Sequence, residues 1–339
     1  MPCSPPSNQP RQMPAVEMRF YSLLHLSDSD PLPINSKISN SSDRVRILCR
    51  VAYTLGRSLL AHGHRLTVFT NAAAVIERQL SEFGGPNFDM QEIEFESSVP
   101  PGTRFYSAHF KFACFHEFAR AESGVHFLID LDIICLRPIP EEIARVCMAD
   151  GFAVYDISTQ VAPAVGWGKV QRDLRSLNGI SGEQSWFGGE FIGATPASFR
   201  RLYSLIREMM SDYATRLPEF HHIGDELLTS AALNALRQRG THLYDAGVGG
   251  SVRRHWSVRT KHEQAALKLG TLPSLLHLPA DKDFLAGLAS SPPDDLLRFE
   301  HRYRRNARRK KIGLPSDSGI GDSIKILLSR LWPRDSGSL

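Results

Sequence analysis

The sequence predicts an α/β protein with a mostly parallel central sheet flanked by helices. Short apolar segments typical of strands alternate with longer segments whose apolar residues recur every three or four positions, and such alternation is typical of a layered α/β fold. The chain is also long enough to bury a large core, with 339 residues of which 42% are apolar. We expect one domain at residues 16–290, between a disordered, Pro- and Ser-rich leader at residues 1–15 and a basic tail at residues 291–339.

The first half of the chain supplies three expected strands and two expected helices. Met18–Leu26 is an apolar and aromatic run that ends in a polar stretch, which predicts a buried strand followed by a loop. A helix is expected to begin near Asp43, because apolar residues then follow at helical spacing, and to end at Gly63. We further expect a strand at Arg65–Thr70, a helix within Thr103–Ala121 and a buried strand within the nearly continuous apolar run Val125–Leu136.

The second half continues the alternation. Pro196 is expected in the first turn of a helix, where its missing N–H leaves no hydrogen bond unmade. The expected elements are strands at Gly151–Asp156, Phe191–Ala194 and Ser274–Leu278, helices at Pro196–Met210 and Glu226–Arg237, and an amphipathic helix at Ile320–Trp332 in the basic tail.

Charge and cysteine content exclude several classes of protein. The net charge is only +4, and Arg298–Lys311 alone carries eight Lys and Arg residues against one Glu, so we expect no nucleic acid partner. No apolar run is long enough to span a bilayer, the first residues lack the apolar core of a secretory signal, and neither a dinucleotide-binding glycine loop nor a P-loop occurs. The cysteines form no Cys-x-x-Cys pair, which favours reduced thiols in the cytoplasm over disulfides or a zinc site: Cys3, Cys49, Cys114, Cys135 and Cys147.

Asp130-Leu131-Asp132 is the most informative part of the sequence. Two carboxylates two positions apart on a strand point to the same face, and burying both without compensation is costly. The apolar residues on either side place the pair at the end of a buried strand, where open α/β sheets bind ligands. The pair predicts a site for a divalent metal ion or a ligand; the alternative is a strand end capped in water.

Other residues are candidates for the same site. Lys111 lies on the helix before the Asp pair, either on a solvated face or beside a phosphate. Gly188 and Gly189 enter a strand, where glycine permits either the close approach of a ligand or a bulge. His277 is either a core residue or a nitrogen ligand that completes a metal site, and one nitrogen with two oxygens suits Mn²⁺ better than Mg²⁺. Lys282 follows it closely.

The stretch Phe105–Pro138 resembles the helix, strand and D-x-D block of nucleotide-sugar glycosyltransferases of the GT-A fold, in particular family 8 and related D-x-D sugar-transferase families. Trp186–Leu202, His222–Asn234 and Leu275–Lys282 resemble later blocks of the same enzymes. The resemblance implies a GT-A fold and a hexosyltransferase. Such an enzyme moves a sugar from a nucleotide-diphosphate sugar, with UDP as the expected nucleotide, to a hydroxyl of a glycan or lipid-linked acceptor.

The resemblance also implies roles for single residues. Asp130, Asp132 and His277 would hold Mn²⁺, or Mg²⁺, on the donor diphosphate. The anomeric configuration would be retained, although an inverting enzyme with Asp225 or Glu226 as base stays open. The implied catalytic residues are Asp225, Glu226 and Glu190, and the implied donor-binding residues are Tyr21, His25, Asn71, Lys111, Gly188, Gly189 and Lys282.

Two other functions remain open on the sequence. A phosphohydrolase of the haloacid-dehalogenase type also uses a D-x-D after an apolar strand and a later Gly-Asp pair, here Gly224-Asp225. A non-enzymatic protein could instead bind glycans or an anionic surface through the basic tail. We expect the protein in the cytoplasm, with the tail in peripheral contact with the inner face of a membrane, because each Lys or Arg near anionic lipid contributes about 1 kcal/mol.

Overall fold

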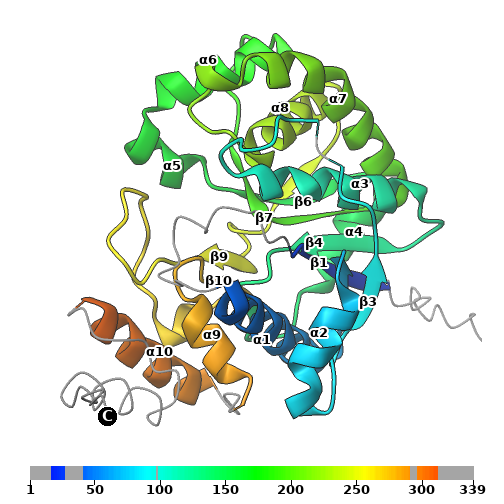
Figure 1. Ribbon diagram of the computed structural model, residues 1–339. Coiled ribbons are helices and arrows are strands. Elements are labelled where there is room, and N and C mark those ends of the chain that lie inside the picture. Colours follow the sequence, from blue (N-terminus) through cyan, green and yellow to red (C-terminus); the bar gives the residue numbers. More distant parts are fainter. Residues whose placement is uncertain (1–16, 27–40, 97, 291–295, 312–339) are drawn as a thin grey trace, which may run out of the picture.

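The computed structural model describes residues 17–26, 41–96, 98–290 and 296–311. A central sheet is built from β1 (Met18–Leu24), β2 (Leu66–Thr70), β3 (Asp89–Glu92), β4 (Val125–Ile129), β6 (Phe152–Asp156), β7 (Phe187–Ala194) and β8 (Leu243–Asp245). Its spatial order is β3-β2-β1-β4-β7-β6-β8, and all its pairings are parallel except those of β7 with β4 and β6 (Figure 1). The predicted α/β class with a mostly parallel sheet is confirmed.

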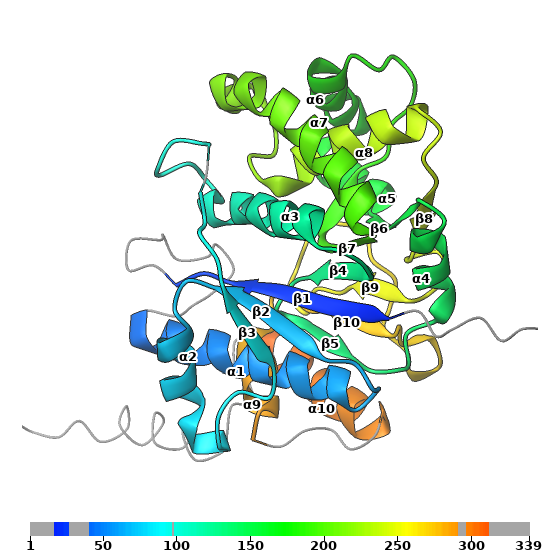
Figure 2. The same cartoon turned by 90° about the vertical axis from the view of Figure 1, so that its right-hand side faces the viewer.

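Helices cover both faces of this sheet. The helices of the described residues are α1 (Ser41–Leu60), α2 (Ala73–Leu80), α3 (Lys111–Arg120), α4 (Glu141–Met148), α5 (Ser158–Val165), α6 (Trp167–Asn178), α7 (Pro196–Thr215), α8 (Asp225–Gln238), α9 (Lys282–Leu288) and α10 (Leu296–Lys311), the last two of which pack elsewhere. Figure 2 shows α1 and α2 on one side of the sheet and α3 and α7 on the other. None of the helices in the described part of the chain is long and apolar enough to cross a membrane.

The expected helices form because their apolar residues meet the sheet or each other. In α1, Cys49, Leu55 and Leu59 follow at helical spacing and are fully buried. In α7, Thr195 caps the start by accepting a hydrogen bond from the Ser198 N–H, and Pro196 occupies the first turn as predicted. The sequence patterns did not predict α2, α4, α5, α6, α9, α10, β3, β8 or a further strand, β9 (Val252–Arg254).

The apolar run Val125–Leu136 divides into two strands at the Asp pair, which the sequence predicted to lie at the end of a buried strand. β4 ends at Ile129, and Asp130 to Asp132 form a turn in which the Ile133 N–H donates to the Asp130 carbonyl over 3.3 Å. β5 (Ile133–Cys135) then leaves the central sheet and joins a second sheet with β10 (Leu275–His277) and β9 (Val252–Arg254), in the order β5-β10-β9. The turn therefore places the aspartates where the two sheets meet.

A second hydrophobic core lies below the three-stranded sheet. Phe284 and Leu285 of α9 pack there with Phe299 and Tyr303 of α10. α10 belongs to the segment that the sequence analysis assigned to a basic tail, yet its apolar side is buried in the domain. The predicted leader at residues 1–15 and the predicted helix at Ile320–Trp332 lie outside the described residues, so the division of the chain stays a prediction.

Candidate active site

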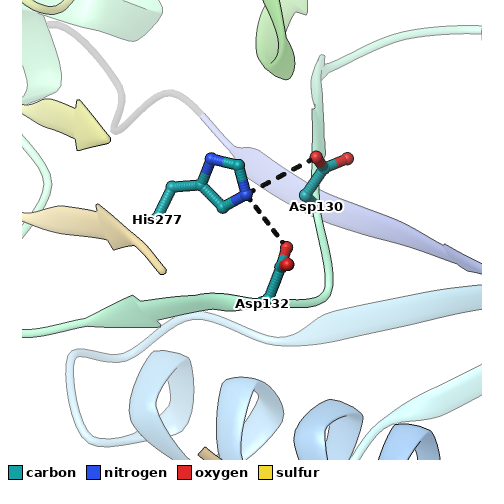
Figure 3. Close-up of side chains that lie close together, drawn as sticks. All are labelled: Asp130, Asp132 and His277. Carbon is teal, nitrogen blue, oxygen red and sulfur yellow. Dashed lines mark hydrogen bonds and ion pairs between the residues drawn. The ribbon is translucent and has the colours of Figure 1, made fainter. Parts of the chain in front are cut away.

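Asp130, Asp132 and His277 come together although they lie far apart in the sequence. His277 Nε2 is 3.1 Å from Asp132 Oδ1 and 3.8 Å from Asp130 Oδ2, and one ligand atom from each residue lies within 4.8 Å of the others (Figure 3). The strand pairing explains the meeting, because His277 of β10 pairs in register with Ile133 of β5, directly after the turn. The Leu278 N–H also donates to the Asp132 carbonyl over 2.9 Å.

Two lysines flank this cluster. Lys111, at the first turn of α3, places its Nζ 2.8 Å from Asp130 Oδ1, 3.1 Å from Asp225 Oδ2 and 2.8 Å from the Gly189 carbonyl oxygen. Lys282, at the first turn of α9, donates to Asp132 Oδ2. Burial alone would lower the pKa of Lys111, but Asp130 and Asp225 outweigh it and raise the pKa, so the amine stays charged.

A second group of charges lies behind the cluster and centres on Arg254 of β9. Its guanidinium holds Glu190 through two bonds, Nε to Oε1 at 2.6 Å and Nη2 to Oε2 at 2.5 Å, and contacts Glu226 Oε1 at 3.0 Å. Glu190 also lies 3.3 Å from His277 Nδ1. Trp186 Nε1 donates to Glu226 Oε2 over 2.9 Å. Arg254 thus joins two of the predicted catalytic carboxylates to the ring of His277.

The two glycines of β7 make room for these side chains. A Cβ on Gly188 would lie 2.1 Å from Glu190 Oε2, and a Cβ on Gly189 would lie 2.3 Å from Asp225 Oδ2 and 2.9 Å from Lys111 Nζ. Any larger residue would displace the charged groups. The pairing of β7 with β6 also shifts register between Ile192 and Phe187, so the glycines lie at an irregularity of the strand. The groups that approach them closely are the protein's own charged side chains.

The pKa directions follow from burial and partners. Burial raises the pKa of Asp130, although the positive charge of Lys111 opposes this. Burial would also raise the pKa of Asp132, but the positive charges of Lys282 and His277 outweigh it and lower the pKa well below its usual range. Burial would lower the pKa of His277, but Asp132 raises it to about 9. At Glu226, burial is again outweighed, here by Arg254, and the pKa falls to about 2.

The whole site carries more negative than positive charge. Five carboxylates face three permanently cationic side chains, Lys111, Arg254 and Lys282; the carboxylates are Asp130, Asp132, Glu190, Asp225 and Glu226. Within the described residues, Asp130, Asp132 and His277 form the one group with metal-ligand geometry. Two carboxylate oxygens and one imidazole nitrogen are ligands that suit a divalent cation such as Mn²⁺, and its charge would offset the excess. The residues present therefore fit a metal ion.

The remaining predicted donor contacts are not part of this cluster. Tyr21 lies in the middle of β1, and its ring packs against Phe69 and Phe118 at centroid distances of 5.2 and 4.8 Å. Asn71 binds the backbone of Leu26 through both atoms of its amide, each bond being 2.9 Å. His25 packs on the Phe110 ring at 4.4 Å and lines a hollow together with Asn71. Because β1, β2 and β4 are parallel neighbours, His25 and Asn71 lie at the same sheet edge as Asp130, whereas Tyr21 does not.

Comparison with known proteins found no matching family model and no matching curated protein. Among solved structures, the chain is similar to the galactosyltransferase LgtC in complex with donor and acceptor sugar analogs, with a TM-score of 0.49 and 10% identity over 81% of this chain and 98% of that one. It is also similar to mouse xyloside xylosyltransferase 1, with a TM-score of 0.43 and 10% identity over 77% and 97% of the two chains. A third match is the bifunctional glycosyltransferase WbbM, with a TM-score of 0.48 and 10% identity over 84% and 51%.

All three similar structures are glycosyltransferases by name, which is the class that the sequence resemblance implied. The side chains of the site indicate its chemistry independently of these similarities.

Proposed function

We propose that the protein is a metal-dependent glycosyltransferase of the GT-A fold. It would move a hexose from a nucleotide-diphosphate sugar, with UDP as the nucleotide, to a hydroxyl of a glycan or lipid-linked acceptor. The observation that supports this most is the meeting of Asp130, Asp132 and His277 with a lysine on each side. A metal site between two lysines matches the charge of a diphosphate, which brings its own negative oxygens.

In this proposal Asp130, Asp132 and His277 hold a divalent cation, Mn²⁺ or Mg²⁺. When bound, the cation would stabilise the negative charge that develops on the departing nucleoside diphosphate. Lys282, whose side chain is 25% exposed, adds a second positive charge next to Asp132. Lys111 is held between Asp130 and Asp225 and so links the metal ligands to the start of α8.

The carboxylates at the start of α8 are the best candidates for contact with the reacting sugar. Asp225 and Glu226 lie in the first turn of α8, and both are largely buried. Since the pKa of Glu226 is lowered to about 2, this group is ionised near neutral pH and can stabilise positive charge on the sugar. Glu190 is fully buried with both oxygens held by Arg254, so we propose that it positions His277 and Arg254 rather than touching substrate.

Retention of the anomeric configuration, a location in the cytoplasm and peripheral contact with a membrane belong to the same proposal. The contact is supported by basic side chains that α10 exposes, among them Arg304, Arg308 and Lys311. Sedimentation with vesicles of anionic lipid tests it. Loss of binding when Arg304 and Arg308 are both changed to Gln is expected, and unchanged binding would remove this part of the proposal.

A thermal-shift screen tests the proposed function. The protein is heated with UDP-, GDP- and CMP-sugars, each with and without Mn²⁺, because a ligand that binds only the folded state raises the melting temperature. We expect a rise with one nucleotide sugar that requires Mn²⁺ and is lost in Asp132→Asn. The proposal is wrong if no nucleotide sugar shifts the melting temperature, and hydrolysis of a simple phosphate ester would favour the phosphohydrolase.

A further inference from the structure

The inner face of α10 converges on one buried carboxylate, that of Asp281, which directly precedes Lys282. Asp281 has no exposed surface. Its Oδ2 accepts from the Tyr303 hydroxyl at 2.9 Å, and its Oδ1 accepts from Asn306 Nδ2 and Lys310 Nζ, each at 2.8 Å. Since Tyr303, Asn306 and Lys310 are spaced by three and four residues, they share one face of the helix.

Asp281 also fixes the backbone that carries Lys282. The Asp281 N–H donates to the Leu278 carbonyl over 3.0 Å, and the Asp281 carbonyl accepts from the Leu285 N–H over 2.9 Å, so Asp281 is the N-cap residue of α9. Lys310 reaches the same loop a second time through the carbonyl of Ala280. Side chains of α10 therefore hold both the last loop residue and the residue before it.

The loop held in this way is tied to Asp132 at both ends. The Leu278 N–H donates to the Asp132 carbonyl, and Lys282 donates to the Asp132 carboxylate. Residues 278–282 thus form a short bridge whose ends touch one metal-ligand candidate and whose last turn is fixed by α10. A shift at Asp281 would move the Lys282 amine, because the two residues are neighbours at the start of a helix.

We propose that Asp281, together with Tyr303, Asn306 and Lys310 of α10, positions Lys282 for the donor diphosphate, which makes the basic helix α10 a functional part of the nucleotide site. This inference rests on the proposed function for the identity of the ligand. The alternative is that the contacts of α10 with the loop only attach the helix to the rest of the protein. The two roles predict different effects of α10 variants on the Lys282 amine.

The first experiment measures the reactivity of Lys282 without any nucleotide. The full-length protein is labelled with an amine-acetylating reagent, and the rate at each lysine is read by mass spectrometry. Lys310→Met removes the cation that pairs with Asp281, and Tyr303→Phe removes one hydrogen bond while keeping the ring. Lys311→Met is the matched control, because Lys311 is the next residue and is exposed.

We expect Lys282 to react at least threefold faster in Lys310→Met, with a smaller increase in Tyr303→Phe and none in Lys311→Met. Lys111, which is held by Asp130 and Asp225 on the opposite flank, is the internal reference and should keep its rate. Unchanged reactivity at Lys282, or an equal increase at Lys111 from general unfolding, would overturn the inference.

The second experiment is a double-mutant cycle in which calorimetry measures the binding of UDP in the presence of Mn²⁺. Lys310→Met should weaken binding about tenfold in the wild-type background and less than twofold when Lys282 is already Met, because the helix acts through that amine. Equal weakening in both backgrounds would show a merely structural role and overturn the inference. If the wild-type protein binds neither UDP nor another nucleoside diphosphate, the proposed function fails, whereas the labelling result still decides whether α10 positions Lys282.

Discussion

The two charged groups of the site differ in how completely their side chains are enclosed. Asp130, in the group with Asp132 and His277, keeps 29% of its side chain exposed. Glu190, in the group with Arg254, keeps none, and both its oxygens are bound by one guanidinium. The first group can accept a new partner without breaking the fold, whereas the Glu190–Arg254 pair cannot. We infer that the first group binds and that this pair supports, and the predictions below test this division.

The largest expected effect is on activity, from Asp132→Asn. The change removes the charge of a metal ligand but keeps its shape, so sugar transfer should fall by on the order of 10²–10³-fold. Rates are measured with the nucleotide sugar found in the thermal-shift screen. Asp150→Asn, at an exposed aspartate whose carboxylate has a 4.0 Å contact to Arg201, is the control and should keep full activity. Similar rates in both variants would remove Asp132 from the binding group.

The largest effect on stability is expected from Arg254→Met. Glu190 would be left buried without its guanidinium partner, with only His277 Nδ1 3.3 Å away. Breaking a buried ion pair in this way typically costs about 3–5 kcal/mol. Urea unfolding measures the free energy, and Arg253→Met is the control because Arg253 lies on the same strand and bonds only backbone carbonyls near the surface. A loss below about 1 kcal/mol would contradict a supporting role for the Glu190–Arg254 pair.

Gly189→Ala tests how tightly the charged side chains of the site are packed. The added Cβ would meet the Asp225 carboxylate and the Lys111 amine, so we expect a loss of about 1–3 kcal/mol in stability with a shift of Lys111 away from Asp130. Gly182→Ala, which meets nothing within 4 Å, should have little effect. Stability is again followed by urea unfolding, and a neutral result for Gly189→Ala would mean that the charged groups are packed more loosely than described.

The smallest effect concerns acid. The pKa of Glu226 is lowered to about 2 in the folded protein. The ionised side chain therefore contributes its full stabilisation when the pH is above the pKa of Glu226 in the unfolded chain, and this contribution is lost as the pH falls toward 2. Between pH 5 and pH 3, wild type should therefore lose about 1–2 kcal/mol more stability than Glu226→Gln. Unfolding curves at both pH values measure this, and identical losses would show that Arg254 does not hold Glu226 ionised.

Local patterns in the sequence predicted the site residues that are close neighbours along the chain. The apolar flanks placed Asp130 and Asp132 at a strand end, and His277 and Lys282 lie in one short segment at the end of an apolar run. The sequence could not show that Ile133–Cys135 forms a strand of a second sheet, because both halves of the run have the same buried, strand-like composition.

Partners fixed by tertiary structure were missed. Arg254 lies on a three-residue strand without periodicity, and nothing near it in the sequence indicates that Glu190 and Glu226 are its partners. In the same way, the Lys and Arg residues of α10 predicted a basic surface, but not that Lys310 turns inward to Asp281. Tyr21 was placed at the nucleotide on strand position alone, whereas its ring packs against Phe118 of α3.

Binding of Mn²⁺ tests the central claim most directly. The six-line electron paramagnetic resonance signal of free Mn²⁺ disappears when the ion binds, so titration gives the number of sites and their affinity. We predict one site per chain that tightens when UDP is added and is lost in both Asp132→Asn and His277→Ala. Equal Mn²⁺ binding by wild type and both variants, or UDP binding that is indifferent to Mn²⁺, would contradict the account.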